Sequence, residues 1–243
     1  NEWHEFDRWP PPKAPRMKLY VHADGDVSFS KPKGKGGYDE YVSDPDKPVP
    51  HTPKIVIRRD DRYVVQDQRF AASRPDVLVY ESPPLTDDMT VIGELFAHLY
   101  VTTTGTDADF IVKLIDVYPN DASYVGPNPR GIKMGGFQFM VRGDIMRAKY
   151  RNSFEHPEPM KPGEITKIRF DMQDVAHTFL KGHKIMVQIQ STWFPLANRN
   201  PQVFTRQYKA PAESYQKATH RVYMTPDHPS HLELGILKTQ KKR

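Results

Sequence analysis

The amino-acid sequence predicts an all-β fold, with two packed sheets arranged as a jelly-roll β-sandwich. Residues 90–102 alternate between apolar and more polar side chains, which is the period-2 pattern of a long β-strand. No segment keeps an apolar period of about 3.6 residues over several turns, and loops rich in Pro and Gly separate the short β-rich runs. About ten short strands separated in this way are typical of a sandwich whose connections cross between its sheets.

The stretch 90–102 is expected to be the centre of the fold. A polar turn over residues 103–107 follows it, and a second β-rich run over 110–118 ends before Pro119. We expect these two strands to form a hairpin-like pair with one apolar face, and such a face requires cover from a second sheet. The apolar face of the first strand consists of Val91, Gly93, Leu95, Ala97, Leu99 and Val101.

The other strands are expected on both sides of that pair. Residues 18–22 form a short strand before a turn, and residues 30–53 form a long surface excursion anchored by Tyr38 and Tyr41. In the strand 184–190 the branched residues point inward and the alternating ones outward. Further strands are expected at 54–58, 62–66, 77–80, 137–142, 165–170, 184–190, 221–224 and 231–237.

Composition excludes several classes of protein. The net charge is +5, but the basic residues are scattered among 30 acidic ones, and the only dense basic run is the tail 238–243. With no nucleic-acid-binding signature beside that tail, we expect no nucleic-acid partner. No apolar run approaches the roughly 20 residues of a membrane helix. The chain has no cysteine, which excludes disulfides and thiolate chemistry and leaves periplasmic, secreted and cytoplasmic locations open.

A search for catalytic machinery finds no nucleophile. None of the serines stands in a G-x-S-x-G elbow, and no phosphate loop or dinucleotide fingerprint occurs, so we expect no catalytic residue and no cofactor. His228 and His231 form the one tight histidine pair and are expected to be turn residues rather than metal ligands. Asp107 and Asp109 leave calcium open, but a turn cap and an ion pair with a neighbour such as Lys113 are favoured.

Two short segments are candidates for a functional surface. Asp67, Gln68 and Arg69 precede a β-run, and Arg69 could pair with a buried carboxylate such as Asp76 or Asp116. The second segment follows the strand 184–190 and would place an exposed apolar patch at its end, which often marks an interface. This second segment consists of Trp193, Phe194 and Pro195.

Several motifs together resemble the C-terminal domain of the CocE/NonD serine hydrolases. They are RPDVLVYESPPLT (74–86), TGTDADFIVKLIDVYP (104–119), MRAKYRNSFEHP (146–157), KGHKIMVQIQSTWFPLANRNPQ (181–202) and HRVYMTPDHPSHLEL (220–234). The family includes cocaine esterase, glutaryl-7-aminocephalosporanic acid acylase, α-amino acid ester hydrolases and Xaa-Pro dipeptidyl-peptidases. The ester hydrolases look most similar, because EWHEFDRWP (2–10) and GGYDEYVSDPDKPVP (36–50) also fit them.

The resemblance implies a non-catalytic jelly roll, similar to galactose-binding domains, over residues 17–243. Residues 1–16 would then be a linker from an upstream α/β-hydrolase domain that carries the Ser–His–Asp triad. The domain would pack on that partner and wall its substrate cleft through residues 67–69, with Trp193, Phe194 and Pro195 at their base. The parent would hydrolyse α-amino acid esters, β-lactam side-chain amides or related acyl or peptidyl substrates, and could form a homo-oligomer.

Two other functions are weighed against this one. A carbohydrate-binding β-sandwich would use exposed aromatic rings to stack on sugars, and Trp3, Trp9, Trp193 and Tyr38 are the rings available. An independent hydrolase would need a metal site such as one built on His228 and His231. The order of the motifs favours the hydrolase accessory domain over both.

Overall fold

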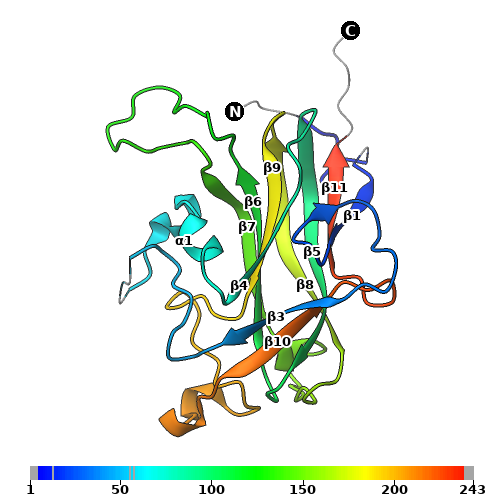
Figure 1. The fold of residues 1–243 in the computed structure, drawn as a ribbon, viewed down its shortest axis with the longest axis vertical. Coiled ribbons are helices and arrows are strands. Elements are labelled where there is room, and N and C mark those ends of the chain that lie inside the picture. The colour runs from blue at the N-terminus through cyan, green and yellow to red at the C-terminus, as the bar shows by residue number, and fades with distance from the viewer. Residues whose placement is uncertain (1–4, 13, 55, 57, 238–243) are drawn as a thin grey trace.

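The computed structural model describes residues 5–12, 14–54, 56 and 58–237, and it shows two antiparallel sheets packed face to face (Figure 1). This confirms the all-β, two-sheet prediction. The strands are β1 (Arg16–Val21), β2 (Val27–Ser28), β3 (Tyr38–Ser43), β4 (Val77–Glu81), β5 (Met89–Thr103), β6 (Asp109–Val117), β7 (Gln138–Arg147), β8 (Thr166–Phe179), β9 (Lys184–Gln190), β10 (Ala218–Tyr223) and β11 (His231–Leu237).

The helical segments of the described residues are short. They are α1 (Arg69–Ala72) and the 3-10 turns η1 (Asp61–Val65), η2 (Ala148–Tyr150), η3 (Gln207–Lys209) and η4 (Ala212–Ser214). Within the described residues no helix has the length and apolarity needed to cross a membrane.

The seven-stranded sheet is built around β5. Its strand order is β2-β1-β11-β5-β10-β3, and β8 pairs along the other edge of β5. The four-stranded sheet has the order β4-β9-β6-β7. Side chains of Leu95, Leu99, Phe110 and Leu114 are fully or almost fully buried between the two sheets and form part of one continuous core. The predicted apolar face of β5 therefore does face the second sheet.

The expected hairpin between β5 and β6 is wrong, because the two strands lie in different sheets. Every residue of β6 is buried. Phe110 and Val112 belong to the core between the sheets, whereas Ile111 and Ile115 pack on the opposite side of the strand. A strand with two apolar faces needs cover on both sides, so the short turn after β5 carries the chain across to the other sheet.

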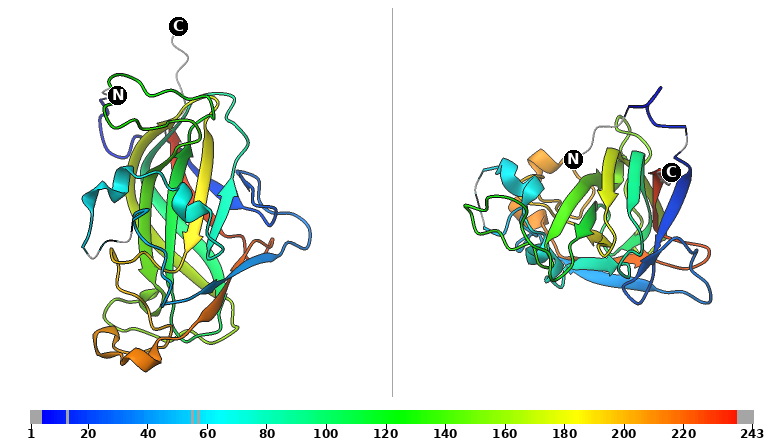
Figure 2. Two further views of the ribbon diagram at one scale, coloured as in Figure 1. Left: turned by 60° about the vertical axis from the view of Figure 1, so that its left-hand side comes forward. Right: turned by 90° about the horizontal axis from the view of Figure 1, so that it is seen from above.

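A third layer covers the outer face of the four-stranded sheet. Figure 2 shows the cyan segment with η1 and α1 outside the green and yellow strands. The predicted outward residues of β9 are consequently buried, including Met186 at 2% exposure and Gln188 at 0%. Sequence alternation identified both faces of β9 but not the layer that covers the second one.

Two further strand predictions are wrong. Residues 62–66 mostly form η1 instead of a strand. Asp60 caps the start of η1, because the Asp60 carboxylate accepts from the backbone amide of Arg62 at 3.0 Å. Of the expected strand 54–58, residues 55 and 57 lie outside the described residues, and the others are not in a strand. Conversely, the excursion 30–53 contains the strand β3, in which Tyr41 is buried and Tyr38 remains exposed.

The N-terminal segment crosses the seven-stranded sheet at Gly93. Gly93 has φ +88°, and a Cβ atom there would lie 2.8 Å from Cβ of Pro10. Only glycine accepts both that backbone conformation and that approach. Trp9, in the same segment, donates from its indole to Asp174 on β8.

Candidate functional site

The two segments selected from the sequence meet at Lys113, in the outer layer of the four-stranded sheet. Lys113 lies on β6, is 0% exposed, and donates from Nζ to Oε1 of Gln68 at 3.0 Å. The same Nζ lies over the ring of Trp193, 5.2 Å from its centroid. One buried amine therefore contacts a residue of each segment.

Glycine on the neighbouring strand makes room for this arrangement. Gly143 of β7 pairs in register with Lys113. A Cβ atom at Gly143 would lie 3.1 Å from the Trp193 ring and 3.3 Å from Cγ of Lys113. A larger side chain at this position would displace the indole or the amine.

Burial sets the protonation state of Lys113. Removal from water lowers the pKa of its amine to about 7. Two polar atoms near Lys113 are buried without a hydrogen-bond partner among the described residues: Nε1 of Trp193, whose ring lies beside the amine, and Oε1 of Gln188, which is opposite Lys113 in the strand register. Buried polar groups therefore lie beside the Lys113 amine.

Asp67, Gln68 and Arg69 form a hydrogen-bonded corner at the start of α1. The Asp67 carboxylate accepts from the backbone amides of Arg69 and Gln138, at 3.1 and 3.3 Å. The exposed Arg69 guanidinium forms an ion pair with Asp67 and donates to the Gly135 carbonyl at 3.2 Å. Gln68 is buried, and its backbone amide donates to the Gln138 carbonyl of β7 at 3.0 Å.

The predicted partners of Arg69 are wrong. Asp76 pairs with Arg74 at 2.8 Å. Asp116 accepts from His177 and His183 at 2.9 and 2.7 Å. Arg69 pairs instead with Asp67, which is two residues away on the same corner. The sequence alone does not show whether an arginine will pair with a nearby carboxylate or with a distant one.

Trp193 is not part of an exposed patch, since only 4% of it is accessible. Its ring packs edge-on against Tyr63 of η1, with centroids 5.5 Å apart. Phe194 and Pro195 are partly exposed, and the backbone of Phe194 bonds to Val49 at 3.0 Å. Trp193 closes the outer layer, whereas its two neighbours border the surface.

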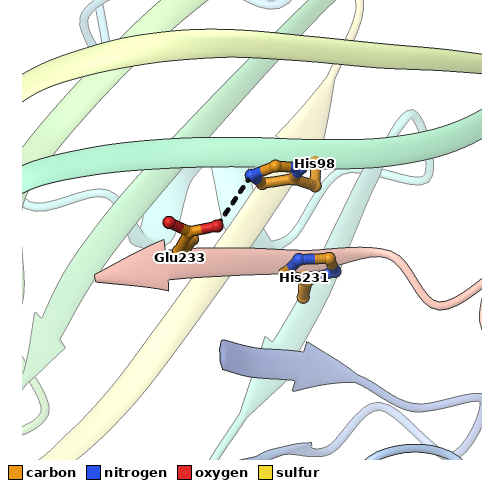
Figure 3. Close-up of side chains that lie close together, drawn as sticks. All are labelled: His98, His231 and Glu233. Carbon is orange, nitrogen blue, oxygen red and sulfur yellow. Dashed lines mark ion pairs between the residues drawn. The ribbon is translucent and has the colours of Figure 1, made fainter. Parts of the chain in front are cut away.

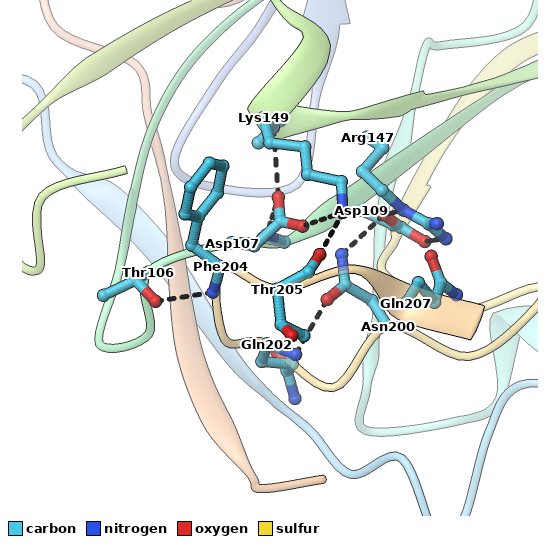
Figure 4. Close-up of polar contacts among 12 residues, drawn as sticks. Thr106, Asp107, Asp109, Arg147, Lys149, Asn200, Gln202, Phe204, Thr205 and Gln207 are labelled. Carbon is cyan, nitrogen blue, oxygen red and sulfur yellow. Dashed lines mark hydrogen bonds and ion pairs between the residues drawn. The ribbon is translucent and has the colours of Figure 1, made fainter. Parts of the chain in front are cut away.

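Asp107 and Asp109 are both buried and both bonded to protein donors (Figure 4). The Asp107 carboxylate accepts from the amides of Ala108 and Lys149 at 3.0 Å each, and burial followed by the charge of Asp109 raises its pKa to about 6. Asp109 forms a two-point pair with Arg147 at 2.8 Å. Asp107 therefore bonds to the residue after the turn and to η2, and the partner of Asp109 is Arg147 rather than the expected Lys113.

A cluster that sequence analysis missed lies on the seven-stranded sheet (Figure 3). His98, His231 and Glu233 place one ligand atom each within 4.8 Å of one another. Burial lowers the pKa of His98 to about 4 and also lowers that of His231. His228, the expected companion of His231, instead packs against Tyr100 with ring centroids 5.4 Å apart. These side chains lie on the face of β5 and β11 that points away from the core between the sheets. They become neighbours because His231 is opposite His98 in the strand register, which the sequence alone does not show.

Comparison with known proteins identifies the family. Residues 1–233 match the X-Pro dipeptidyl-peptidase C-terminal non-catalytic domain. The cocaine esterase of Rhodococcus sp. (strain MB1 Bresler) is 30% identical over 246 residues, which span 98% of this chain and 40% of the esterase.

Two solved structures share both fold and sequence. An aminopeptidase from a marine sediment archaeon, Thaumarchaeota archaeon, superposes with a TM-score of 0.90 at 44% identity, over 98% of this chain and 39% of its own. An α-amino acid ester hydrolase superposes with a TM-score of 0.83 at 41% identity, over 90% of this chain and 36% of its own. The chain thus spans about 40% of the length of these relatives. It belongs to the family of X-Pro dipeptidyl-peptidase C-terminal non-catalytic domains, the domain found in CocE/NonD hydrolases.

Proposed function

We propose that the chain is the C-terminal accessory domain of a longer serine hydrolase, where it packs on the catalytic α/β-hydrolase domain and walls the substrate cleft. The observation that carries the proposal is the match to a non-catalytic domain family over residues 1–233, together with relatives of which the chain spans about 40%. The sequence also contains no nucleophile elbow.

The names of the relatives support a substrate class for the longer protein. An aminopeptidase and an α-amino acid ester hydrolase share 44% and 41% identity with the chain, against 30% for cocaine esterase. We therefore propose hydrolysis of esters or amides next to a free α-amino group, with β-lactam side-chain amides and X-Pro peptides as further substrates. The catalytic residues would lie outside residues 1–243.

The corner formed by Asp67, Gln68 and Arg69 is the proposed cleft wall. Gln68 is fixed to the sheet through Lys113, while Arg69 stays exposed and is held by Asp67 and the Gly135 carbonyl. A positive group held in this way loses little freedom when a substrate or a neighbouring domain binds it. An exposed charge that is held by two contacts suits the wall of a cleft.

The test uses the longer protein with Arg69→Ala. We expect kcat/KM for an aminoacyl ester to fall about 10- to 150-fold, as for the loss of one charge-assisted hydrogen bond. Arg221→Ala is the matched control, because Arg221 forms a similarly exposed pair with Glu40 on the seven-stranded sheet. Equal kinetics for Arg69→Ala and the unsubstituted protein, with both folded, would remove residues 67–69 from the cleft wall.

The carbohydrate-binding alternative is not favoured. Stacking on a sugar requires an exposed row of aromatic rings, and Trp193 is buried beneath η1. Trp9 and Tyr38 are exposed at 47% and 43%, and Trp3 lies outside the described residues. The ring that the sequence placed at the end of β9 is therefore unavailable as a platform.

A further inference from the structure

The outer face of the seven-stranded sheet carries a group of side chains that the proposed function does not use. His231 of β11 lies directly opposite His98 of β5 in the strand register. Glu233 follows His231 by two residues, so it projects from the same face of β11. Two positions on one strand and a third across from them direct three donor groups to one place on the sheet.

Both imidazoles have an unsatisfied nitrogen. His98 and His231 are 8% and 7% exposed, and Nε2 of each is buried without a hydrogen-bond partner among the described residues. Nδ1 of His231 lies 2.7 Å from the Pro229 carbonyl oxygen and therefore donates to it. This bond leaves the lone pair on Nε2, and a carbonyl bond at the other ring nitrogen is the usual support of a metal-binding histidine.

The two carboxylate oxygens of Glu233 have different neighbours. Oε1 of Glu233 accepts from Arg16 at 2.8 Å, while Oε2 faces Nε2 of His98 at 3.4 Å. Arg16 additionally pairs with Glu94, which balances part of its charge. One oxygen of Glu233 thus remains directed toward the two histidines.

We propose that His98, His231 and Glu233 form a binding site for a divalent transition-metal ion, of which zinc is the representative. Two imidazole nitrogens and one carboxylate oxygen are a donor set that zinc accepts. The ligand atoms already lie within 4.8 Å of one another. The site would fasten β11 to β5, so its effect is on the sheet rather than on hydrolysis.

The rings must turn for both to bind one ion. They are stacked with centroids 4.6 Å apart and an interplanar angle of 7°. The lone pair of an imidazole nitrogen lies in the ring plane, so two parallel stacked rings cannot both direct it at one ion. We expect zinc to break this stack by rotating the His98 ring about its Cβ–Cγ bond, a torsion with a broad energy profile, because the bond to the Pro229 carbonyl holds the His231 ring.

The test is calorimetric titration of zinc chloride into the metal-free chain in a non-chelating buffer. We expect one zinc per chain, and binding weakened at least about tenfold in each of His98→Gln, His231→Gln and Glu233→Gln. His156→Gln is the matched control, because His156 is exposed and its ring has no hydrogen bond in the described structure. Far-UV circular dichroism establishes that each variant is folded.

A second measurement does not depend on the variants. Long-range proton–nitrogen NMR spectra of the unsubstituted chain should show zinc shifting the Nε2 signals of His98 and His231 and leaving that of His156 in place. The proposal is overturned if zinc binds no more tightly than it does to the His98→Gln variant. It is equally overturned if zinc shifts neither Nε2 signal, or if binding is lost with His156→Gln.

Discussion

The side-chain amine of Lys113 donates to the side-chain carbonyl of Gln68 across 3.0 Å, inside the layer that covers the four-stranded sheet. This bond joins β6 to the residue before α1, next to the exposed Arg69. Because Lys113 has no access to water, the bond is formed where a charged amine would be strongly disfavoured. The position of the proposed cleft wall therefore depends on a group buried in the sheet.

The protonation of Lys113 predicts a pH dependence of stability. Burial lowers its pKa to about 7, against about 10.4 in an unfolded chain. Between these values the unfolded chain holds one more proton than the folded chain, so this group makes stability rise as pH rises from about 7 to about 10. The effect should be on the order of a few kcal/mol.

Urea unfolding at several pH values tests this dependence. The stability difference between the unsubstituted chain and Lys113→Met should grow in favour of the unsubstituted chain across that window. Lys184→Met is the control, because Lys184 on the adjacent β9 is partly exposed and pairs with Glu81. A difference that stays constant from pH 7 to 10 would show that Lys113 keeps an ordinary pKa.

Asp107 predicts a dependence of the opposite sign at lower pH. Burial and the neighbouring Asp109 raise the pKa of Asp107 to about 6, so the folded chain holds the extra proton between about 4 and 6. The stabilisation that protonated Asp107 gives the folded chain is complete below about pH 4 and is lost as pH rises through about 6. Relative to Asp107→Asn, the unsubstituted chain should lose about 3 kcal/mol across this window in urea titrations. A gain of stability over the same range would contradict the direction of the shift.

The pair between Arg147 and Asp109 should contribute strongly to the stability of the fold. Asp109 is 2% exposed and accepts from both Arg147 and Asn200. Arg147→Met leaves a buried carboxylate without its charge partner, which costs about 3–5 kcal/mol. Thermal and urea unfolding measure the loss.

Two variants control that prediction. Arg221→Met breaks the exposed pair with Glu40 and should cost no more than about 1 kcal/mol. Adding Asp109→Asn to Arg147→Met should recover part of the loss, because no unpaired charge then remains buried. If the double variant is less stable than Arg147→Met alone, charge burial is not the cause.

Trp193 should contribute to stability and to the position of the cleft wall. Trp193→Ala removes a 4% exposed indole that packs on Tyr63 and should cost about 3–5 kcal/mol in urea unfolding. Trp9→Ala, at a 47% exposed indole, should cost about 1 kcal/mol or less. In the longer protein we expect Trp193→Ala to change turnover as well. Unchanged stability together with unchanged turnover would exclude both roles.

Local patterns predicted the strands better than their partners. Alternation identified β5, and the bounds of β9 and β11 match the predicted ranges 184–190 and 231–237. It could not show that β6 leaves the sheet of β5, because a short turn permits either a hairpin or a crossing between sheets. Both faces of β6 are apolar, and that was the available signal for a strand covered on both sides.

The candidate sites show the same limit. Sequence selected Gln68 and Trp193 as members of separate segments, but the link through Lys113 requires the packing of a layer over the sheet. It also paired His231 with the nearby His228, whereas the register of β5 and β11 pairs it with His98. Spacing along the chain reports neighbours within a strand, and neighbours across strands depend on register.

The most direct measurement is hydrolysis of an aminoacyl p-nitroanilide and an aminoacyl ester by the purified 243-residue chain beside the longer gene product, each verified by intact mass. An accessory domain without a nucleophile predicts turnover by the longer protein and none by the chain alone. Turnover by the chain itself, retained through purification, would contradict the non-catalytic assignment.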